Sequence, residues 1–287
     1  MIEILKAGLY TTIQDKGRTG YRALGVPVSG AMDTVSAAMA NKLLNNDTEA
    51  AVLEFTMMGP KLQFKVPTVI SICGAAFQPK INGKSIDLNK AISVAKKDIL
   101  TLGHPEFGSY GYLAVSGGFE AQEVLGSRSF YKNITKNSNL EKGAILKLQN
   151  PSSEKILRNA SFAIDSSHFS DNTIEVFPGP ELHLLSKKFQ KEILASTLKI
   201  GSQSNRMAYV MEGLEAFSAK EIITAPVQPG TVQLTPSGKC VVLMRDAQTT
   251  GGYARIFQLT NHAICKLAQK RAGDKVQVKV KKYYNDN

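Results

Sequence analysis

The side chains best suited to chemistry lie in a few polar loops, and the first of these follows a short apolar segment near the N-terminus. It contains Gln14, Asp15 and Arg18 among glycines and threonines. An amide both donates and accepts hydrogen bonds, a carboxylate can take up a proton, and an arginine presents a planar fork that matches a carboxylate or a phosphate. We therefore predict a ligand-binding loop, with a structural turn closed by an Asp–Arg pair as the alternative.

A second loop leads into the first predicted helix and contains Ser29, Gly30 and Asp33. Backbone N–H groups at the start of a helix attract anions, so this loop is a candidate anion-binding site. Ser29 is the predicted N-cap of the helix. Asp33 falls in the predicted first turn, where the helix dipole favours a carboxylate whatever its function. It is therefore a candidate both for proton transfer and for a structural role.

A third loop contains Ser116, Gly117 and Gly118 and leads to Ser127 and Arg128. Glycines let a backbone approach a ligand closely, and hydroxyl and guanidinium groups supply hydrogen-bond donors. A Gly-Gly pair is also common in hairpin turns, so this loop alone does not decide between the two interpretations.

A fourth loop, which carries Gln248, Thr249, Thr250 and Gly251, follows the apolar segment 240–244. Polar residues and glycine at the exit of a buried strand predict a ligand loop, with an ordinary connection as the alternative.

Several familiar chemical signatures are absent from the sequence. It has no Gly-x4-Gly-Lys-Ser/Thr phosphate loop, no Gly-x-Gly-x-x-Gly between a strand and a helix, and no Gly-x-Ser-x-Gly. The four histidines and three cysteines lack the spacing of metal ligands, and three widely spaced cysteines do not indicate a disulfide framework. We therefore expect neither a metal site nor a self-contained ATPase, dehydrogenase or serine hydrolase.

The elements that must position these loops are mostly strands. Short runs rich in valine and isoleucine, bounded by Gly, Pro, Asn and Asp, predict strands at 2–5, 68–73, 91–95, 99–102, 112–116, 174–177, 231–234, 240–244 and 275–280. Apolar spacing predicts only three short helices, at 32–43, 182–193 and 261–271, with Pro180 suited to a first helical turn. This balance predicts a mainly β fold, sandwich or barrel.

The length of 287 residues suits two domains or one large one. A polar turn that feeds an alternating strand recurs in both halves, which suggests two β units of related build, 1–150 and 151–287. The 43% hydrophobic and 21% charged residues exclude a disordered chain and a coiled coil. The chain has no long apolar run and no N-terminal signal sequence, so we expect a cytoplasmic protein without a membrane partner.

The formal net charge of +11 is concentrated at the C-terminus, where the last 22 residues hold seven Lys or Arg against two Asp. No basic stretch alternates with aromatic residues, as single-strand binding would require, so a nucleic-acid partner is not expected. A solvated basic face, or attraction of small anions such as ATP, explains the excess better.

Nine stretches between residues 11 and 256 occur in an order that is far more specific than any one of them, within a resemblance that runs from about residue 3 to residue 280. The stretches are TTIQDKGRTGY, GVPVSGAMD, LEFTMMGP, CGA, LAVSGG, LGSRS, SNRMAYVMEG, APVQPGTVQL and DAQTTGGYARI. In this order they resemble the carboxyltransferase-domain family. That family includes the C subunit of 5-oxoprolinase (PxpC or KipA), allophanate hydrolase subunit 2 and the matching part of urea carboxylase.

The resemblance implies a cyclophilin-like β-barrel architecture and a role as the C subunit of an ATP-dependent 5-oxoprolinase, a hydrolase that converts 5-oxo-L-proline to L-glutamate. The implied partners are the B subunit, of the PxpB/KipI type, and the A subunit, of the LamB/YcsF type. ATP would be bound by the complex rather than by a phosphate loop of this chain. Whether the chain is active by itself stays open.

Two alternatives remain. One is the carboxyltransferase subunit of a biotin-dependent system that resembles urea carboxylase; the chain has no Ala-Met-Lys-Met biotin-acceptor segment, so biotin would come from a partner. The other is a KipA-type antagonist of a kinase-inhibitor protein, which would need only the partner interface.

The resemblance also implies roles for the loop residues. Those expected in catalysis are Asp15, Arg18, Asp33 and Gln248. Those expected to bind substrate are Gln14, Ser29, Gly30, Ser116, Gly117, Gly118, Ser127, Arg128, Arg206, Thr249, Thr250, Gly251 and Tyr253. The sequence departs from the family pattern at Thr19, Asn205, Ala208, Val210 and Ala254, which puts the role of the segment 204–210 in doubt.

Overall fold

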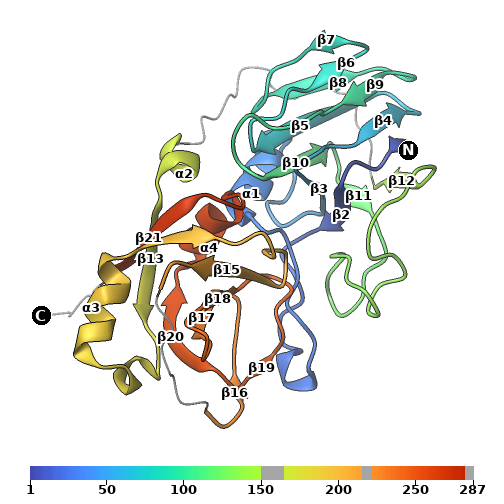
Figure 1. The fold of residues 1–287 in the computed structure, drawn as a ribbon. Coiled ribbons are helices and arrows are strands. Elements are labelled where there is room, and N and C mark those ends of the chain that lie inside the picture. Colours follow the sequence, from blue (N-terminus) through green and yellow to red (C-terminus); the bar gives the residue numbers. More distant parts are fainter. Residues whose placement is uncertain (150–164, 215–221, 282–287) are drawn as a thin grey trace, which may run out of the picture. The chain divides into compact units, whose positions relative to one another are not determined.

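The computed structural model describes residues 1–149, 165–214 and 222–281, which form two compact units (Figure 1). The first unit comprises Met1–Arg18 and Ser29–Phe169, and the second comprises Thr19–Val28 and Ser170–Asn287. The short segment Thr19–Val28 therefore belongs to the second unit although the first unit surrounds it in sequence. The predicted boundary at residues 150 and 151 lies outside the described residues and stays a prediction.

The first unit contains two antiparallel sheets. The strands of the seven-stranded sheet are, in spatial order, β11 (Phe119–Glu120), β12 (Ile145–Leu148), β1 (Ile2–Lys6), β4 (Lys61–Phe64), β9 (Ile99–Thr101), β6 (Lys80–Ile81) and β7 (Lys84–Ser85). Those of the five-stranded sheet are β2 (Tyr10–Gln14), β3 (Val52–Thr56), β10 (Tyr110–Val115), β5 (Thr68–Gly74) and β8 (Ala91–Val94).

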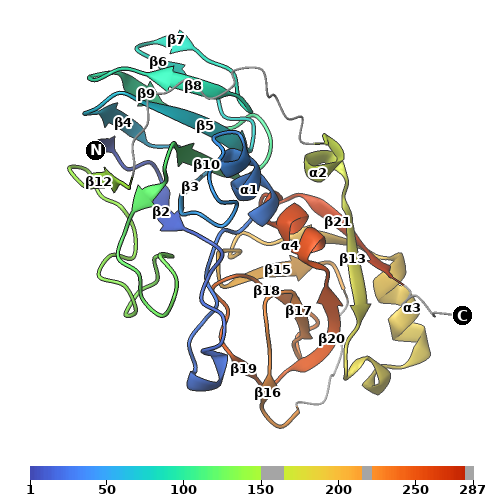
Figure 2. The same cartoon turned by 180° about the vertical axis from the view of Figure 1, so that it is seen from behind.

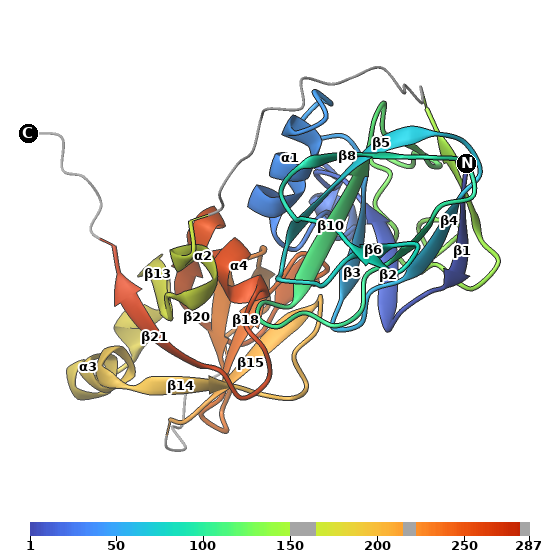
Figure 3. The same cartoon turned by 90° about the horizontal axis from the view of Figure 1, so that it is seen from above.

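The core of the first unit is an apolar cluster to which both sheets contribute, including Ile4, Phe55, Phe64 and Ile72. Helix α1 (Thr34–Lys42) packs on β10 and β5, as Figures 2 and 3 show. All seven residues of β5 are buried. A strand with a core on one side and a helix on the other has no solvent face, and this explains why β5 does not alternate between buried and exposed residues.

The second unit is a closed barrel of seven strands. Around the barrel they are β13 (Thr173–Pro178), β20 (Ala254–Leu259), β17 (Thr231–Leu234), β18 (Cys240–Leu243), β15 (Ala208–Glu212), β14 (Thr197–Ile200) and β21 (Lys275–Val280). The closing pair of β13 and β21 is parallel. Along β21, Val276 and Val278 are buried while their lysine and glutamine neighbours are exposed, the alternation expected of a barrel wall.

The remaining elements of the second unit lie around the barrel. Helix α3 (Lys187–Ala195) packs on β21, and α4 (Asn261–Ala268) packs on β13 and β20. A two-stranded ribbon joins β16 (Ala225–Pro226) to β19 (Thr250–Gly251). The 3-10 helices η1 (Arg22–Leu24) and η2 (Leu182–Leu184) also belong to the second unit, whereas the single-turn helix α2 (Ser167–Ser170) contains the boundary between the two units.

The mainly β architecture with a barrel is confirmed, and all nine predicted strands occur within two residues of their expected bounds. The prediction missed the other twelve strands of the described residues, among them the five-residue β2, β3 and β15 and the six-residue β20. The expected N-cap of α1 was wrong: Asp33 caps the helix, because its carboxylate accepts from the N–H groups of Val35 and Ser36, while Ser29 has φ +58°.

The second predicted helix was too long. Pro180 and the 3-10 turn η2 precede α3, and the chain is extended at Leu185. The hydroxyl of Ser186 then caps α3 by accepting from Phe189 N–H. No helix in the described part of the chain is long and apolar enough to cross a bilayer.

Candidate functional site

The carboxylate of Asp15 ties two of the predicted loops together in the first unit. Its Oδ1 accepts from Gly17 N–H at 2.8 Å and from the hydroxyls of Ser127 and Ser129, each at 2.6 Å. Its Oδ2 accepts from the N–H of Arg128 at 2.5 Å. This buried carboxylate therefore accepts hydrogen bonds from four donors of the protein itself. Asp15 acts as an organiser of the loops, which fixes the positions of the side chains around it.

Arg18 and Gln14 are fully buried beside this junction. The guanidinium of Arg18 donates to the carbonyl oxygen of Ser129. The amide nitrogen of Gln14 donates to Thr12 Oγ1 at 3.1 Å and to the carbonyl of Phe130 at 3.4 Å. Within the described residues the Gln14 Oε1 atom accepts no hydrogen bond. A buried acceptor without a donor is uncommon and is a reasonable place for a ligand or partner group.

Ser29 and Gly30 bring the second loop against the first. Both have positive φ, +58° and +89°. A Cβ at Gly30 would lie 3.0 Å from the backbone of Lys16 and Gly17, so only glycine allows this approach. The N–H of Ala31 donates to the carbonyl of Asp15 at 2.9 Å, which locks the two loops.

Asp33 lies at the end of the second loop and forms a buried pair with His168. Its Oδ2 is 2.8 Å from His168 Nε2, and the side chains are 0% and 3% exposed. The same oxygen accepts from the hydroxyl of Ser36 at 2.6 Å, and Oδ1 accepts from the cap N–H groups. Because a carboxylate in such a cap only accepts, His168 Nε2 carries the hydrogen of this bond.

A second buried acid joins this network through a tyrosine. The hydroxyl of Tyr112 accepts from Asp33 N–H at 2.8 Å and is hydrogen-bonded to Glu54, which also accepts from Met32 N–H at 2.7 Å. Burial raises the pKa of Tyr112 well above its usual value, and the charges of Glu54 and Asp33 add to this. Burial likewise raises the pKa of the Cys73 thiol to about 12. Both groups therefore stay protonated and neutral.

His168 is the residue that the sequence analysis missed. It is separated from Asp33 by 135 positions, and its neighbours show no metal-ligand or triad spacing. Only the fold brings the two side chains together. No group of three or more potential metal-ligating side chains occurs among the residues that the structure describes.

The Ser116–Gly118 candidates form a turn between β10 and β11. Gly117 and Gly118 have φ of +80° and +83°, and Gly118 N–H donates to the carbonyl of Val115 at 2.9 Å. Gly117 N–H donates to the side chain of Asn46 at 3.0 Å. Positive φ at two successive positions explains the Gly-Gly pair by backbone geometry alone.

In the second unit, Arg206 forms a bidentate ion pair with Asp246. Its Nε is 2.7 Å from Oδ2 and its terminal nitrogen is 2.9 Å from Oδ1. Both side chains are mostly buried. The guanidinium of Arg206, which was predicted to bind a ligand, therefore binds Asp246 and stabilises the chain segment before the fourth loop.

The fourth loop forms one strand of the β16–β19 ribbon. The carbonyl of Thr249 accepts from Val227 N–H at 3.0 Å, and Thr250 pairs with Pro226. A Cβ at Gly251 would lie 2.5 Å from the amide nitrogen of Gln233. Two further predicted site residues are exposed on this part of the unit: Gln248 and Tyr253.

Comparisons with known proteins give a consistent result. The family model described as the carboxyltransferase domain, subdomain A and B, matches residues 24–280. The chain is 33% identical to the C subunit of 5-oxoprolinase from Escherichia coli, over 94% of this chain and 87% of that protein. It is 32% identical to the C subunit of 5-oxoprolinase from Haemophilus influenzae, over 96% and 90%.

A solved structure, the urea amidolyase of K. lactis, superposes with a TM-score of 0.87 at 29% identity. The match covers 96% of this chain and 18% of that much longer protein.

Proposed function

Because the chain belongs to the family of carboxyltransferase domains with subdomains A and B, we propose that it is the C subunit of an ATP-dependent 5-oxoprolinase. The observation that carries this proposal is the similarity to two C subunits of 5-oxoprolinase over nearly the full length of both proteins in each comparison. In this proposal the chain works in the cytoplasm with the B and A subunits, and the assembled hydrolase converts 5-oxo-L-proline to L-glutamate.

The chemistry of the substrate explains why such an enzyme needs ATP. A lactam is a stable amide, and phosphorylation of its carbonyl oxygen by ATP makes the ring carbon reactive toward water. The tetrahedral adduct with water then expels the ring nitrogen, which takes up a proton and becomes the amine, and leaves an acyl phosphate. Hydrolysis of this acyl phosphate gives glutamate and inorganic phosphate. The protein must then hold anionic groups with positioned donors and move protons near neutral pH. ATP is bound by the complex, because this chain has no phosphate loop.

We assign proton handling in the first unit to the pair of Asp33 and His168. The 2.8 Å bond fixes the ring orientation and its hydrogen on Nε2, as expected of a carboxylate that orients a general base. The loops around Asp15 then have a positioning role, since they fix the segment that leads to Asp33 through the bond from Ala31.

The test of this assignment is glutamate release by the complete complex of this chain with its B and A partners. We expect His168→Asn and Asp33→Asn to lower kcat by about 100-fold or more, the usual contribution of a positioned acid or base. The control is His104→Asn, an exposed histidine of the first unit whose ring nitrogen hydrogen-bonds to the carbonyl of Met57. Equal kcat in all three variants would refute the assignment.

The likeness to urea amidolyase favours one second candidate, carboxyl transfer from a biotin carried by a partner. That reaction consumes bicarbonate and is blocked by avidin, whereas the 5-oxoprolinase reaction is indifferent to both. Turnover that requires bicarbonate would therefore replace the first proposal by the second.

A further inference from the structure

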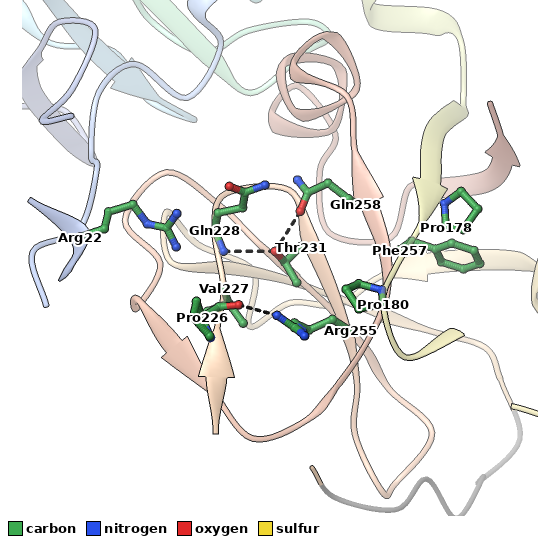
Figure 4. Close-up of a pocket in the computed structure, with 10 residues that line it drawn as sticks. All are labelled: Arg22, Pro178, Pro180, Pro226, Val227, Gln228, Thr231, Arg255, Phe257 and Gln258. Carbon is green, nitrogen blue, oxygen red and sulfur yellow. Dashed lines mark hydrogen bonds between the residues drawn. The ribbon is translucent and has the colours of Figure 1, made fainter. Parts of the chain in front are cut away.

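A cavity of about 330 Å³ in the second unit is lined by none of the residues assigned to proton transfer (Figure 4). Its volume is in the range of small-molecule sites. Its lining residues belong to the second unit, and they are Arg22, Pro178, Pro180, Pro226, Val227, Gln228, Thr231, Arg255, Phe257 and Gln258.

The walls of the cavity are rigid. Three of the lining residues are prolines, whose φ is fixed and which present no N–H groups. Gly179, between two of them, donates from its N–H to the carbonyl of Ile256 at 2.8 Å. A Cβ at Gly179 would lie 2.2 Å from the carbonyl oxygen of Arg255, so the turn after β13 packs directly against β20. Such walls lose little conformational entropy when a ligand binds.

Arg255 lines the cavity, but its positive charge is balanced by an ion pair with Glu181. Its guanidinium forms a fork–fork pair with Glu181 at 2.6 and 2.8 Å and donates to the carbonyl of Pro226 at 2.8 Å. The hydrogen bonds from Arg255 lower the pKa of Glu181, so this pair stays ionised and neutral overall. Thr231 and Gln258 are also engaged with each other, at 2.9 Å.

Arg22 differs from Arg255, because no ion pair or hydrogen bond of its guanidinium occurs among the described residues. Its side chain extends toward that of Gln228, as Figure 4 shows. The cavity thus combines one cation without an ion pair among the described residues, one side-chain amide and flat apolar faces from proline and Phe257. An arginine fork matches a carboxylate, and a primary amide matches the adjacent N–H and C=O of a cyclic amide.

From this combination we infer that the cavity binds a small monocarboxylate that carries a ring amide. This is the chemistry of 5-oxoproline, so the identity of the ligand rests on the proposed function, whereas the site itself does not. The fourth loop then serves as a support: Thr249 and Thr250 hold Val227 and Pro226, which line the cavity, while no residue of 248–251 lines it.

The experiment is calorimetric titration of the full chain with three probes. The first is 5-oxo-L-proline, the second is 2-pyrrolidinone, which lacks the carboxylate, and the third is L-proline, which lacks the ring carbonyl. We expect saturable binding of the first and binding at least about tenfold weaker for each of the others. Equal affinities for the three probes, or no saturable binding of 5-oxo-L-proline at millimolar concentration, would overturn the inference.

Variants of the lining residues test whether 5-oxo-L-proline binds in this cavity. Arg22→Ala and Gln228→Leu should each weaken binding of 5-oxo-L-proline about tenfold or more, and Arg22→Lys should restore part of the loss because it keeps the charge without the fork. The matched control is Arg245→Ala, an arginine of the same unit that bonds to Asn261 and does not line the cavity. Thermal unfolding of each variant separates weak binding from poor folding. Unchanged affinity in folded Arg22→Ala would place the ligand elsewhere and overturn the inference.

The two proposals fail in different ways. A complex that releases glutamate with the same KM for wild type and Arg22→Ala contradicts the cavity assignment and leaves the function standing. A chain that binds 5-oxo-L-proline with the expected ranking, in a complex that releases no glutamate, contradicts the function and leaves the cavity assignment standing.

Discussion

Single residues in this protein show how one carboxylate can organise several loops. Asp15 accepts four hydrogen bonds that come from two segments more than 100 positions apart in sequence. Hydrogen bonds to a buried charged group contribute more to the free energy of unfolding than hydrogen bonds between neutral groups. Loss of the charge leaves the donors poorly paired. The position of Asp15 therefore explains why the loops around residues 15 and 128 keep one geometry.

Asp15→Asn should lower the free energy of unfolding by about 2–4 kcal/mol, because the amide cannot accept from all four donors. Urea unfolding followed by circular dichroism measures the change. The control is Asp47→Asn, in which an exposed carboxylate accepts from Glu49 N–H. A loss for Asp15→Asn no larger than that of the control would contradict the organising role.

Acid should weaken the second unit through Asp171. The hydrogen bond from Lys266 is the main reason that the pKa of Asp171 is lowered from 3.8 to about 2. A carboxyl with a lowered pKa stabilises the fold above its unfolded pKa, and this contribution disappears as the pH falls from about 4 to about 2. The effect is modest, because the side chain is 39% exposed.

Asp171→Asn should therefore flatten the fall in stability over that pH interval and leave the slope above pH 5 unchanged. Unfolding midpoints in urea between pH 2 and pH 6 provide the measurement, with the exposed Asp87→Asn as the control. A variant whose stability falls with acid as steeply as that of the wild type would contradict this account.

At the scale of elements, the β16–β19 ribbon supports one wall of the cavity in the second unit. The ribbon approaches β17 so closely that a methyl group at Gly251 would lie 2.5 Å from the buried amide of Gln233. The adjacent Gly252 has much more space, since among the described residues a methyl group there would meet only Ile222 O, at 3.6 Å. These two neighbours form a natural pair for a test.

Gly251→Ala should displace the ribbon, lower the stability by about 1–3 kcal/mol and weaken binding of 5-oxo-L-proline several-fold. Gly252→Ala should change both quantities little. Calorimetric titration and thermal unfolding measure the two effects. Equal behaviour of the variants would show that the ribbon does not hold the wall.

The sequence predicted those elements whose burial repeats along the chain. In β1 and β21 buried residues alternate with more exposed ones, and β5 is rich in valine and isoleucine, so local patterns revealed them. The start of α1 was placed too early because Ser29 and Asp33 are both good caps by residue type. Positive φ at Ser29, which decides the matter, depends on the packing of its loop on residues 15–17.

The candidate site was predictable only in part. Glycine and polar residues indicated the loops that contain Asp15, Asp33, Ser127 and Gly251. Eight of the predicted residues lie in one connected cluster of the first unit: Gln14, Asp15, Arg18, Ser29, Gly30, Asp33, Ser127 and Arg128. The partner of Asp33 could not be predicted, because the pairing with His168 depends on long-range folding. Arg22 carried no signal either, since its importance comes from the cavity around it.

On the scale of the whole molecule, the chain consists of two β units with different constructions, one of paired sheets and one of a closed barrel. The site that we propose for proton transfer lies in the first, and the site that we propose for the carboxylate lies in the second. The sequence contains no Gly-x4-Gly-Lys-Ser/Thr phosphate loop, and in the proposed function the assembled complex binds ATP.

The most direct measurement is the release of glutamate from 5-oxo-L-proline and ATP. This chain is assayed alone, with each partner of the B and A types separately, and in the complete mixture after co-purification. We expect release only in the complete mixture, unaffected by avidin, and its loss with His168→Asn but not with His104→Asn. A well-formed complex that releases no glutamate, or that turns over only with bicarbonate and biotin, would contradict the account.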